Sequence, residues 1–444
     1  MRVKNILRAL VLFARARGRY GIRTREELER HQQRKLAHFL SSTLSQSPYY
    51  AQYAKPGATL ASLPIVDKKT MMSDFAGFNT CGVDSDTAMR FALDGERTRT
   101  FDEMPTGMAV GLSSGTSGNK GIFLVSPDER LTWAAMLLAR ILSTRTLLRL
   151  LNPFSPPLRV AFFLRADNAL YRTLRNARID LVWHDLMGDL EAALHTMSRH
   201  NPEVVVAPAS VLGKIAAVCL KGDPAIAPTD LISVAETLEP EDATAIRKAF
   251  DIEAKQIYQA TEGLLACTCP CGEMHLNELN LHIEPEWLDD THSRFHPIVT
   301  DFNRRSQIIA RYRLDDIVRV SGRSCSCGSP ERVIDSVEGR ADEVLSLPRY
   351  DGALVQIFPD TLRHTILLSE GTWQEYSIRA EDMHNWHIAL SSEEPERARA
   401  SIQSQLETLF KKLAVIPPTL SFENWVAPPV GSKRRRIANG MGSQ

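Results

Sequence analysis

The chain has 444 residues, too long for one ordinary hydrophobic core, so about two or three domains are expected. Its residues are 43% hydrophobic and 24% charged, which is close to average globular usage. Lys plus Arg and Asp plus Glu number 53 each. This balance argues against a protein that binds nucleic acid through a strongly positive surface.

The first 40 residues are basic and contain a short apolar run from Ala9 to Ala14. Arg15 and Arg17 follow it, without a small-residue cleavage site, so a secretory signal is not expected. We predict an amphipathic helix that packs on the protein rather than on a membrane. No apolar window of about 18 residues occurs, so we expect no membrane span and a cytoplasmic protein.

Strand and helix patterns alternate between Val110 and Ile257. The continuous apolar runs Arg159–Arg165 and Pro202–Ala209 are typical of parallel strands that are covered on both faces. The alternation predicts an α/β sheet domain. From Glu284 to Val320 the pattern becomes more strand-like.

The pattern changes after Gly339 to strand, helix, a pair of strands and a further helix, followed by a basic tail. This order predicts a small α+β domain of about 100 residues. We therefore expect an α/β protein with a large N-terminal domain, residues 1–338, and a small C-terminal α+β domain, residues 339–444.

The segment Gly111–Phe123, "GLSSGTSGNKGIF", is dominated by glycine and hydroxyl residues and contains one lysine. Glycines let backbone N–H groups turn inward, hydroxyls add donors and lysine adds charge, a combination that binds phosphate oxygens. It differs from a Walker loop because Asn119 precedes Lys120 and a strand follows. The alternative is a flexible polar hairpin.

"SSGTSGNKG" resembles the phosphate-binding loop of the adenylate-forming enzymes, which include the acyl- and aryl-CoA ligases. Further segments of that family pattern follow in order: "SVAETLEP" (Ser233–Pro240), "YQATEG" (Tyr258–Gly263), "RYRLDD" (Arg311–Asp316), "VEGRADEVL" (Val337–Leu345) and "VGSKRRRIAN" (Val430–Asn439). The resemblance covers roughly residues 25 to 440. "LPIVDKKTMMSDF" and the cysteine clusters resemble the branch of phenylacetate-CoA ligase and coenzyme F390 synthetase.

The resemblance implies an N-terminal AMP-binding domain, a mobile C-terminal lid and a two-step reaction. A carboxylic acid, aryl in this branch, attacks ATP to give an acyl adenylate and pyrophosphate. The thiol of CoA or of a carrier protein's phosphopantetheine arm then takes the acyl group. The nucleotide-binding residues implied are Ser113, Ser114, Gly115, Thr116, Ser117, Gly118, Lys120, Ala235, Glu236, Tyr258, Asp316 and Arg340.

Three catalytic residues are implied as well. Thr261 contacts the α-phosphate and Glu262 holds Mg²⁺, although a helix N-cap with an acidic first turn is the plain structural alternative for this pair. Lys433 bridges the carboxylate and the α-phosphate. Its Gly-x-Lys spacing leaves Arg434–Arg436 as substitutes and a solvated basic tail as the alternative. Asp342 is the implied hinge.

Five of the seven cysteines fall in two clusters, "CTCPCGEMH" (Cys267–His275) and "CSCG" (Cys325–Gly328). Thiolates and an imidazole at such spacing suit a structural tetrahedral Zn²⁺ site, a zinc knuckle over about residues 267–327. The resemblance selects Cys269, His275, Cys325 and Cys327 as ligands. Cys267 or Cys271 could replace Cys269, and cysteines without a metal are the alternative.

Other functions stay open at this point. A coenzyme F390 synthetase-like adenylyltransferase would form an AMP ester and no thioester. A zinc-containing nucleic-acid-binding protein is disfavoured by the balanced charge, and a protein that binds ATP without catalysis is a further alternative. A homodimer is compatible with the sequence.

Overall fold

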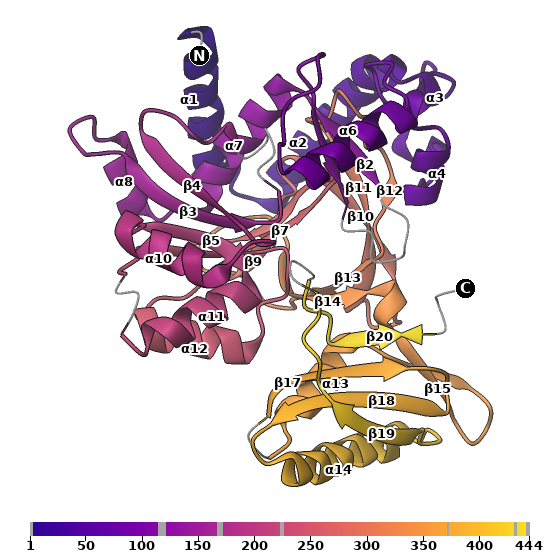
Figure 1. Cartoon of the computed structure of the whole chain (residues 1–444). Coiled ribbons are helices and arrows are strands. Elements are labelled where there is room, and N and C mark those ends of the chain that lie inside the picture. Colours follow the sequence, from indigo (N-terminus) through magenta and orange to yellow (C-terminus); the bar gives the residue numbers. More distant parts are fainter. Residues whose placement is uncertain are drawn as a thin grey trace. The chain divides into compact units, whose positions relative to one another are not determined.

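The computed structural model describes residues 3–113, 121–166, 172–222, 226–370, 373–429 and 433–440, without the side chains of residues 3–6. The chain divides into two compact units (Figure 1). Unit 1 comprises Met1–Leu314 and Arg319–Ser336, and unit 2 comprises Asp315–Val318 and Val337–Gln444. The long segment of unit 2 thus begins just before residues 338 and 339, where the sequence predicts the domain boundary.

The parallel part of the main sheet has the strand order β7-β6-β5-β3-β4. Its strands are β3 (Leu158–Leu164), β4 (Ile179–Asp185), β5 (Val204–Pro208), β6 (Asp230–Val234) and β7 (Lys255–Ala260). The two continuous apolar runs became β3 and β5, which pair in parallel as the sequence predicts. The α/β class is confirmed.

Helices cover both faces of these parallel strands (Figure 1). The helices are α7 (Pro127–Ile141), α8 (Thr144–Leu151), α10 (Leu190–His200), α11 (Ala209–Cys219) and α12 (Pro240–Phe250). Val204 and Val206 pack with Trp133 of α7, whereas Val205 packs with Ile215 of α11 on the opposite face. Successive residues of a strand point to opposite faces of the sheet. Because helices bury both faces, every residue of β3 and β5 is favoured to be apolar, and this explains the unbroken apolar runs in the sequence.

The sheet continues in its antiparallel part with the order β10-β11-β13-β14-β9-β8, and β8 joins β7. These strands are β8 (Gly263–Thr268), β9 (Met274–Leu276), β10 (Leu281–Trp287), β11 (Arg294–Asp301), β13 (Asp316–Val320) and β14 (Val333–Arg340), and β12 (Tyr312–Arg313) pairs with β11. Within the described residues, a separate two-stranded sheet joins β1 (Ala109–Leu112) to β2 (Ile122–Val125).

The N-terminal helix α1 (Val3–Arg17) packs against α7, as the sequence predicts. Phe13 and Ala16 contact Met136 and Ala139, and Arg17 Nη1 donates to the Ala139 carbonyl at 3.0 Å. Among the described helices, none combines the length and the apolar character that crossing a bilayer requires.

Unit 2 contains a sheet of order β19-β18-β17-β20. Its elements are β15 (Leu345–Pro348), β16 (Leu354–Ile357), α13 (Pro359–Leu367), β17 (Trp373–Ala380), β18 (Asn385–Ser392), α14 (Pro395–Leu413), β19 (Thr419–Asn424) and β20 (Ile437–Asn439). The predicted α+β character is confirmed. Trp386 of β18 is buried against Phe410 of α14, with ring centroids 5.5 Å apart, and anchors this core.

We predict that Trp386→Ala destabilises unit 2 by about 3–5 kcal/mol, because it removes a fully buried aromatic side chain from a packed core. Val426→Ala is the control, since Val426 in the same unit is 81% exposed. Calorimetric unfolding of both variants measures the difference. Equal stability of the two variants would contradict this description of the core.

Candidate nucleotide-binding site and candidate metal centre

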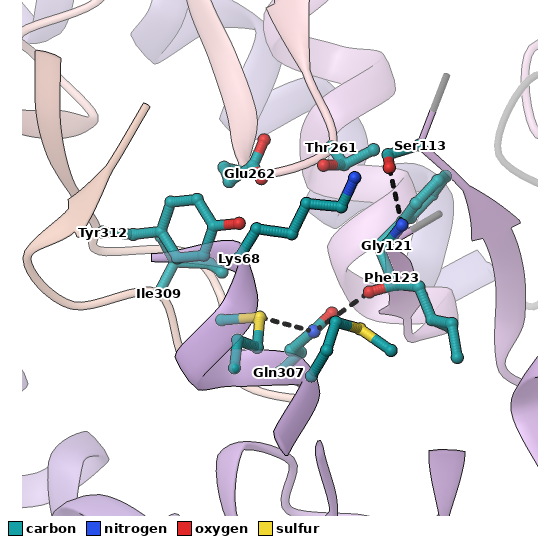
Figure 2. A pocket seen from close by; sticks show the side chains of 12 residues that line it. Lys68, Ser113, Gly121, Phe123, Thr261, Glu262, Gln307, Ile309 and Tyr312 are labelled. Atoms are coloured by element: carbon teal, nitrogen blue, oxygen red, sulfur yellow. Dashed lines mark hydrogen bonds between the residues drawn. The ribbon is translucent and has the colours of Figure 1, made fainter. Parts of the chain in front are cut away.

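A pocket of about 300 Å³, its open mouth included, lies in unit 1 between α4 (Lys68–Ser73), the β1–β2 hairpin and the β7–β8 turn (Figure 2). It is lined by Lys68, Met71, Met72, Ser113, Gly121, Ile122, Phe123, Thr261, Glu262, Gln307, Ile309 and Tyr312. Three residues that the sequence selected, Ser113, Thr261 and Glu262, therefore share one pocket. Distant parts of the chain meet here.

Thr261 and Glu262 form the two-residue turn between β7 and β8, where Ala260 pairs with Gly263. The alternative of a helix N-cap is therefore wrong for this pair. Gly263 permits the turn's close approach to β11, because a Cβ there would lie 3.0 Å from the Asp301 carboxylate oxygen. Burial raises the pKa of that Asp301 carboxyl to about 6.

Ser113 and Gly121 close the base of the glycine-rich loop. Ser113 N–H donates to the Gly121 carbonyl, and Gly121 N–H donates to Ser113 Oγ, both at 2.8 Å. A Cβ on Gly121 would lie 3.0 Å from Lys68 Cε and 3.1 Å from Ser113 Oγ, so a side chain there would push these groups away by a few tenths of an ångström. Of the predicted loop residues, Ser114, Gly115, Thr116, Ser117, Gly118 and Lys120 lie outside the described residues.

Lys68 is a pocket residue that the sequence analysis did not select. Asp67 caps α4 by accepting from Thr70 N–H at 2.7 Å, which makes Lys68 the first helical residue. Figure 2 shows its side chain extended beneath Glu262, with Nζ directed toward Thr261. Lys69 stands in the same first turn of α4, so no local signal in the sequence distinguishes Lys68.

Gln307 lines the pocket and holds β2, the strand that follows the glycine-rich loop. Its Nε2 donates to the Ile122 carbonyl at 3.3 Å, and its Oε1 accepts from Leu124 N–H at 3.0 Å. The buried Arg304 donates to the Leu124 carbonyl at 2.9 Å. The strand that leaves the loop is therefore held by side chains from the segment after β11.

Ala235, Glu236 and Tyr258 lie on or after the neighbouring parallel strands β6 and β7. Ala235 follows β6 with φ +66°, a left-handed conformation that is costly for alanine and is concentrated at functional sites. Glu236 accepts from Ser210 N–H at 3.1 Å and so ties this turn to α11. Because β6 and β7 are parallel, Ala235 and Thr261 leave the sheet at the same edge, where open α/β sheets bind ligands.

Unit 2 gathers Asp316, Arg340 and Asp342. Arg340 Nε lies 3.8 Å from Asp316 Oδ1 and 4.0 Å from Asp342 Oδ1, and Arg340 Nη2 lies 3.7 Å from Asp315 Oδ2. Two carboxylates that the sequence assigned to the ribose and the hinge thus face one guanidinium.

The three arginines after Lys433 each have a carboxylate partner within unit 2. Arg434 and Arg436 lie 3.7 and 3.2 Å from Glu375, and Arg435 lies 2.8 Å from Asp342. Lys433 itself is exposed. The segment is therefore not a solvated basic tail, because carboxylates of unit 2 hold its arginines.

The candidate metal centre consists of Cys269, His275, Cys325 and Cys327, whose ligand atoms all lie within 4.8 Å of one another. The Cys269 and Cys325 sulfurs are 3.6 Å apart, and Cys327 Sγ lies 3.5 Å from His275 Nε2. Three thiols and one imidazole fit a closed tetrahedral zinc site. Burial raises the pKa of Cys269 to about 12, and a bound dication would lower it.

The other two clustered cysteines lie outside this group. Cys267 is buried, with its sulfur 3.0 Å from Arg140 Nε, and Cys271 is exposed. Cys269 is therefore the cysteine of "CTCPCG" that completes the set.

Groups around the candidate centre orient its ligands. His275 Nδ1 lies 3.0 Å from the Glu331 carbonyl, which directs Nε2 toward the sulfurs. The Glu331 carboxylate in turn pairs with the buried Arg140 of α7 at 2.7 Å. Arg19 Nη1 donates to the Cys327 carbonyl at 2.7 Å. These bonds tie the centre to α7 and to the segment after α1.

No family model matches the sequence, and no curated protein matches it. Solved structures do match. 2-Hydroxyisobutyryl-CoA ligase in the postadenylation state, in complex with 2-HIB-AMP, has a TM-score of 0.61 at 15% identity, over 93% of this chain and 89% of its own. The amide bond synthetase McbA from Marinactinospora thermotolerans has a TM-score of 0.52 at 13% identity, over 74% and 68%. ATP-bound MatB from Rhodopseudomonas palustris has a TM-score of 0.51 at 12% identity, and the match covers 74% of this chain and 66% of MatB.

This chain has the fold of the adenylate-forming ligases. At these identities the likeness concerns the fold alone. Within the adenylate-forming fold described here, tertiary structure joins Ser113, Thr261 and Glu262 in one pocket and joins Asp316, Arg340 and Asp342 in unit 2.

We predict that the purified chain binds about one zinc ion and that Cys325→Ser abolishes stoichiometric binding, because a tetrahedral site loses one of its ligands. Cys271→Ser is the matched control, since this exposed cysteine lies outside the group. Elemental analysis after dialysis measures the metal, and chelation should lower the melting temperature. Loss of zinc in Cys271→Ser with retention in Cys325→Ser would refute the ligand set.

Proposed function

We propose that the protein activates a carboxylic acid, of aryl type, with ATP to form an acyl adenylate. The observation that carries this proposal is the pocket in which Ser113 and Gly121, at the base of the glycine-hydroxyl loop, face Lys68 and the Thr261–Glu262 turn. Such a pocket combines hydroxyls, a cation and a carboxylate, which together suit a metal-bound polyphosphate. The fold and the order of the sequence motifs support the same reaction.

The first step joins an acid oxygen to the α-phosphorus of ATP while the bond to the β-phosphate oxygen breaks and pyrophosphate leaves. In our proposal, the Ser113–Lys120 loop holds the β- and γ-phosphates and Thr261 contacts the α-phosphate. Lys433 neutralises the charge between the carboxylate and the α-phosphate. Fixed charges aimed at the transition state lower its energy without reorganisation.

Glu262 is our candidate ligand for Mg²⁺, because its carboxylate stands at the tip of a turn and lines the pocket. Oxygen ligands of this kind suit Mg²⁺, which screens the phosphate charges when bound. Asp316 would accept hydrogen bonds from the ribose hydroxyls, with Arg340 beside it. Zn²⁺ would have a structural role at the cysteine–histidine group.

In the second step we propose that the thiol of CoA or of a carrier protein's phosphopantetheine attacks the acyl carbon and releases AMP. The similar CoA ligase structure supports CoA as the first acceptor to test. Rotation of unit 2 about Asp342 would present different residues of unit 2 to the active site in the two steps. Hinge motions of this kind occur in other enzymes. A cytoplasmic location fits these substrates.

The function is tested by ATP–pyrophosphate exchange with a panel of aryl and aliphatic acids. We expect exchange with at least one aryl acid, followed by a thioester when CoA or holo-carrier protein is added. An AMP ester without a thioester would assign the coenzyme F390 synthetase-like reaction instead. ATP binding without exchange for every acid would refute acid activation.

We predict that Lys68→Met lowers the rate of acid-dependent exchange by roughly 10²–10³-fold, the usual cost of one preorganised charge donor. Lys69→Met is the matched control, because Lys69 is the next residue of α4 and is exposed. Initial rates at saturating ATP, together with melting temperatures, separate the two variants. Equal rates for both would remove Lys68 from the site.

A further inference from the structure

The segment that carries Lys433 is built into the sheet of unit 2. β20 pairs in parallel with β17, so that Ile437 lies beside Ile378, and Ile378 N–H donates to the Arg436 carbonyl at 2.7 Å. The buried Arg436 guanidinium lies 4.6 Å from the ring centre of Tyr376. The backbone just after Lys433 is therefore held by the domain core.

Arg435 links this segment to the short helix η5 (Ala341–Glu343). Its Nη2 donates to Asp342 Oδ2 at 2.8 Å and its Nε donates to Glu343 Oε1 at 2.9 Å. Two nitrogens of one planar group thus engage two adjacent carboxylates, a geometry that lysine cannot reproduce. Asn439 Nδ2 adds a second link, to the Val344 carbonyl at 2.9 Å.

The backbone before η5 is shaped around the same carboxylate. Glu343 Oε2 accepts from Arg340 N–H at 3.2 Å. Gly339 has φ +132°, and a Cβ there would lie 2.6 Å from Glu343 Oε2, so only glycine fits. Burial raises the pKa of the Glu343 carboxyl, and the Arg435 guanidinium opposes that rise.

These contacts form a continuous chain of charges. Asp316 faces Arg340, Arg340 faces Asp342, and Asp342 binds Arg435, two residues after Lys433. The residue proposed to hold the ribose and the residue proposed to bridge the reacting groups are therefore connected through the hinge. A misplacement of about 1 Å in a reacting group can lower a rate by about 10²-fold, so a link that fixes the position of the Lys433 segment would matter for the rate.

We propose that Arg435 is a positioning residue that ties the Lys433 segment to the hinge at Asp342 and Glu343. The proposal rests on the proposed function for its catalytic part. Arg435 acts through Lys433 and therefore serves the adenylation step. In the proposed mechanism Lys433 acts in adenylation and not in thiol transfer, so we expect Arg435 to leave the second step unaffected.

Arg435→Gln tests the proposal, with Arg434→Gln as the matched control from the same arginine run. We expect the kcat of ATP–pyrophosphate exchange to fall roughly tenfold in Arg435→Gln, which corresponds to the loss of one partly buried charge pair. Thioester formation from supplied acyl adenylate should stay unchanged. In Arg434→Gln the exchange rate should fall less than in Arg435→Gln, because Glu375 keeps Arg436 as a partner and η5 keeps Arg435.

Glu343→Gln should lower exchange to a similar extent, and the double variant Arg435→Gln/Glu343→Gln should be no slower than either single variant. Additive losses would overturn the proposal. So would an equal fall of both half-reactions in Arg435→Gln, because a general loss of structure would then explain the effect.

Hydrogen exchange of the full chain provides a readout that needs no acid substrate. Amides of residues 340–344 and 436–439 should exchange faster in Arg435→Gln than in Arg434→Gln, and equal exchange in the two variants would overturn the link. If the wild type shows no pyrophosphate exchange with any acid, the proposed function fails, while this measurement still decides whether Arg435 holds the hinge.

Discussion

The pairing of β7 with a parallel strand on one side and an antiparallel strand on the other determines where the candidate site lies. On its parallel side, β7 joins strands whose two faces are buried by helices, so polar groups leave the sheet only at the strand ends. On its antiparallel side, the two-residue turn to β8 lifts Thr261 and Glu262 above that edge. Hydroxyl and carboxylate chemistry is therefore held by backbone hydrogen bonds rather than by a long loop.

The pocket is assembled from segments that are distant in sequence. Lys68 comes from a short helix near the N-terminus, Gly121 from the β1–β2 hairpin and Gln307 from the segment after β11. Close packing explains the choice of residues, since any side chain at Gly121 would meet Lys68 and Ser113. Glycine at this position leaves room for the Lys68 side chain beside the loop base.

Partly buried arginines outside the pocket have carboxylate partners that join structural elements. Arg140 binds Glu331, whose carbonyl orients His275 of the candidate metal centre, and Arg435 binds the acidic pair of η5. Such pairs contribute modestly to stability after desolvation, but breaking one leaves an uncompensated charge. Each ion pair thus constrains the geometry. The arginines near the end of unit 2 pair with carboxylates of the same unit and do not form a purely cationic surface.

Part of this structure follows from sequence alone. The unbroken apolar runs indicated the parallel strands because burial on both faces removes the alternation of polar residues. The composition of the glycine-hydroxyl segment indicated phosphate chemistry. The clustering of cysteines and histidine indicated a metal site, and the family resemblance selected the four ligands that the fold brings within 4.8 Å.

Other features depended on contacts between distant residues, which no local pattern contains. The sequence analysis missed Lys68 because its significance arises from its approach to Gly121 and Thr261, not from its neighbours in the chain. It selected Cys269 through the resemblance but left Cys267 and Cys271 open as replacements, because burial and contact partners are visible only in the fold. It could not show that the three arginines after Lys433 pair with carboxylates of unit 2, because most of those partners are distant in the sequence and only the fold brings them close.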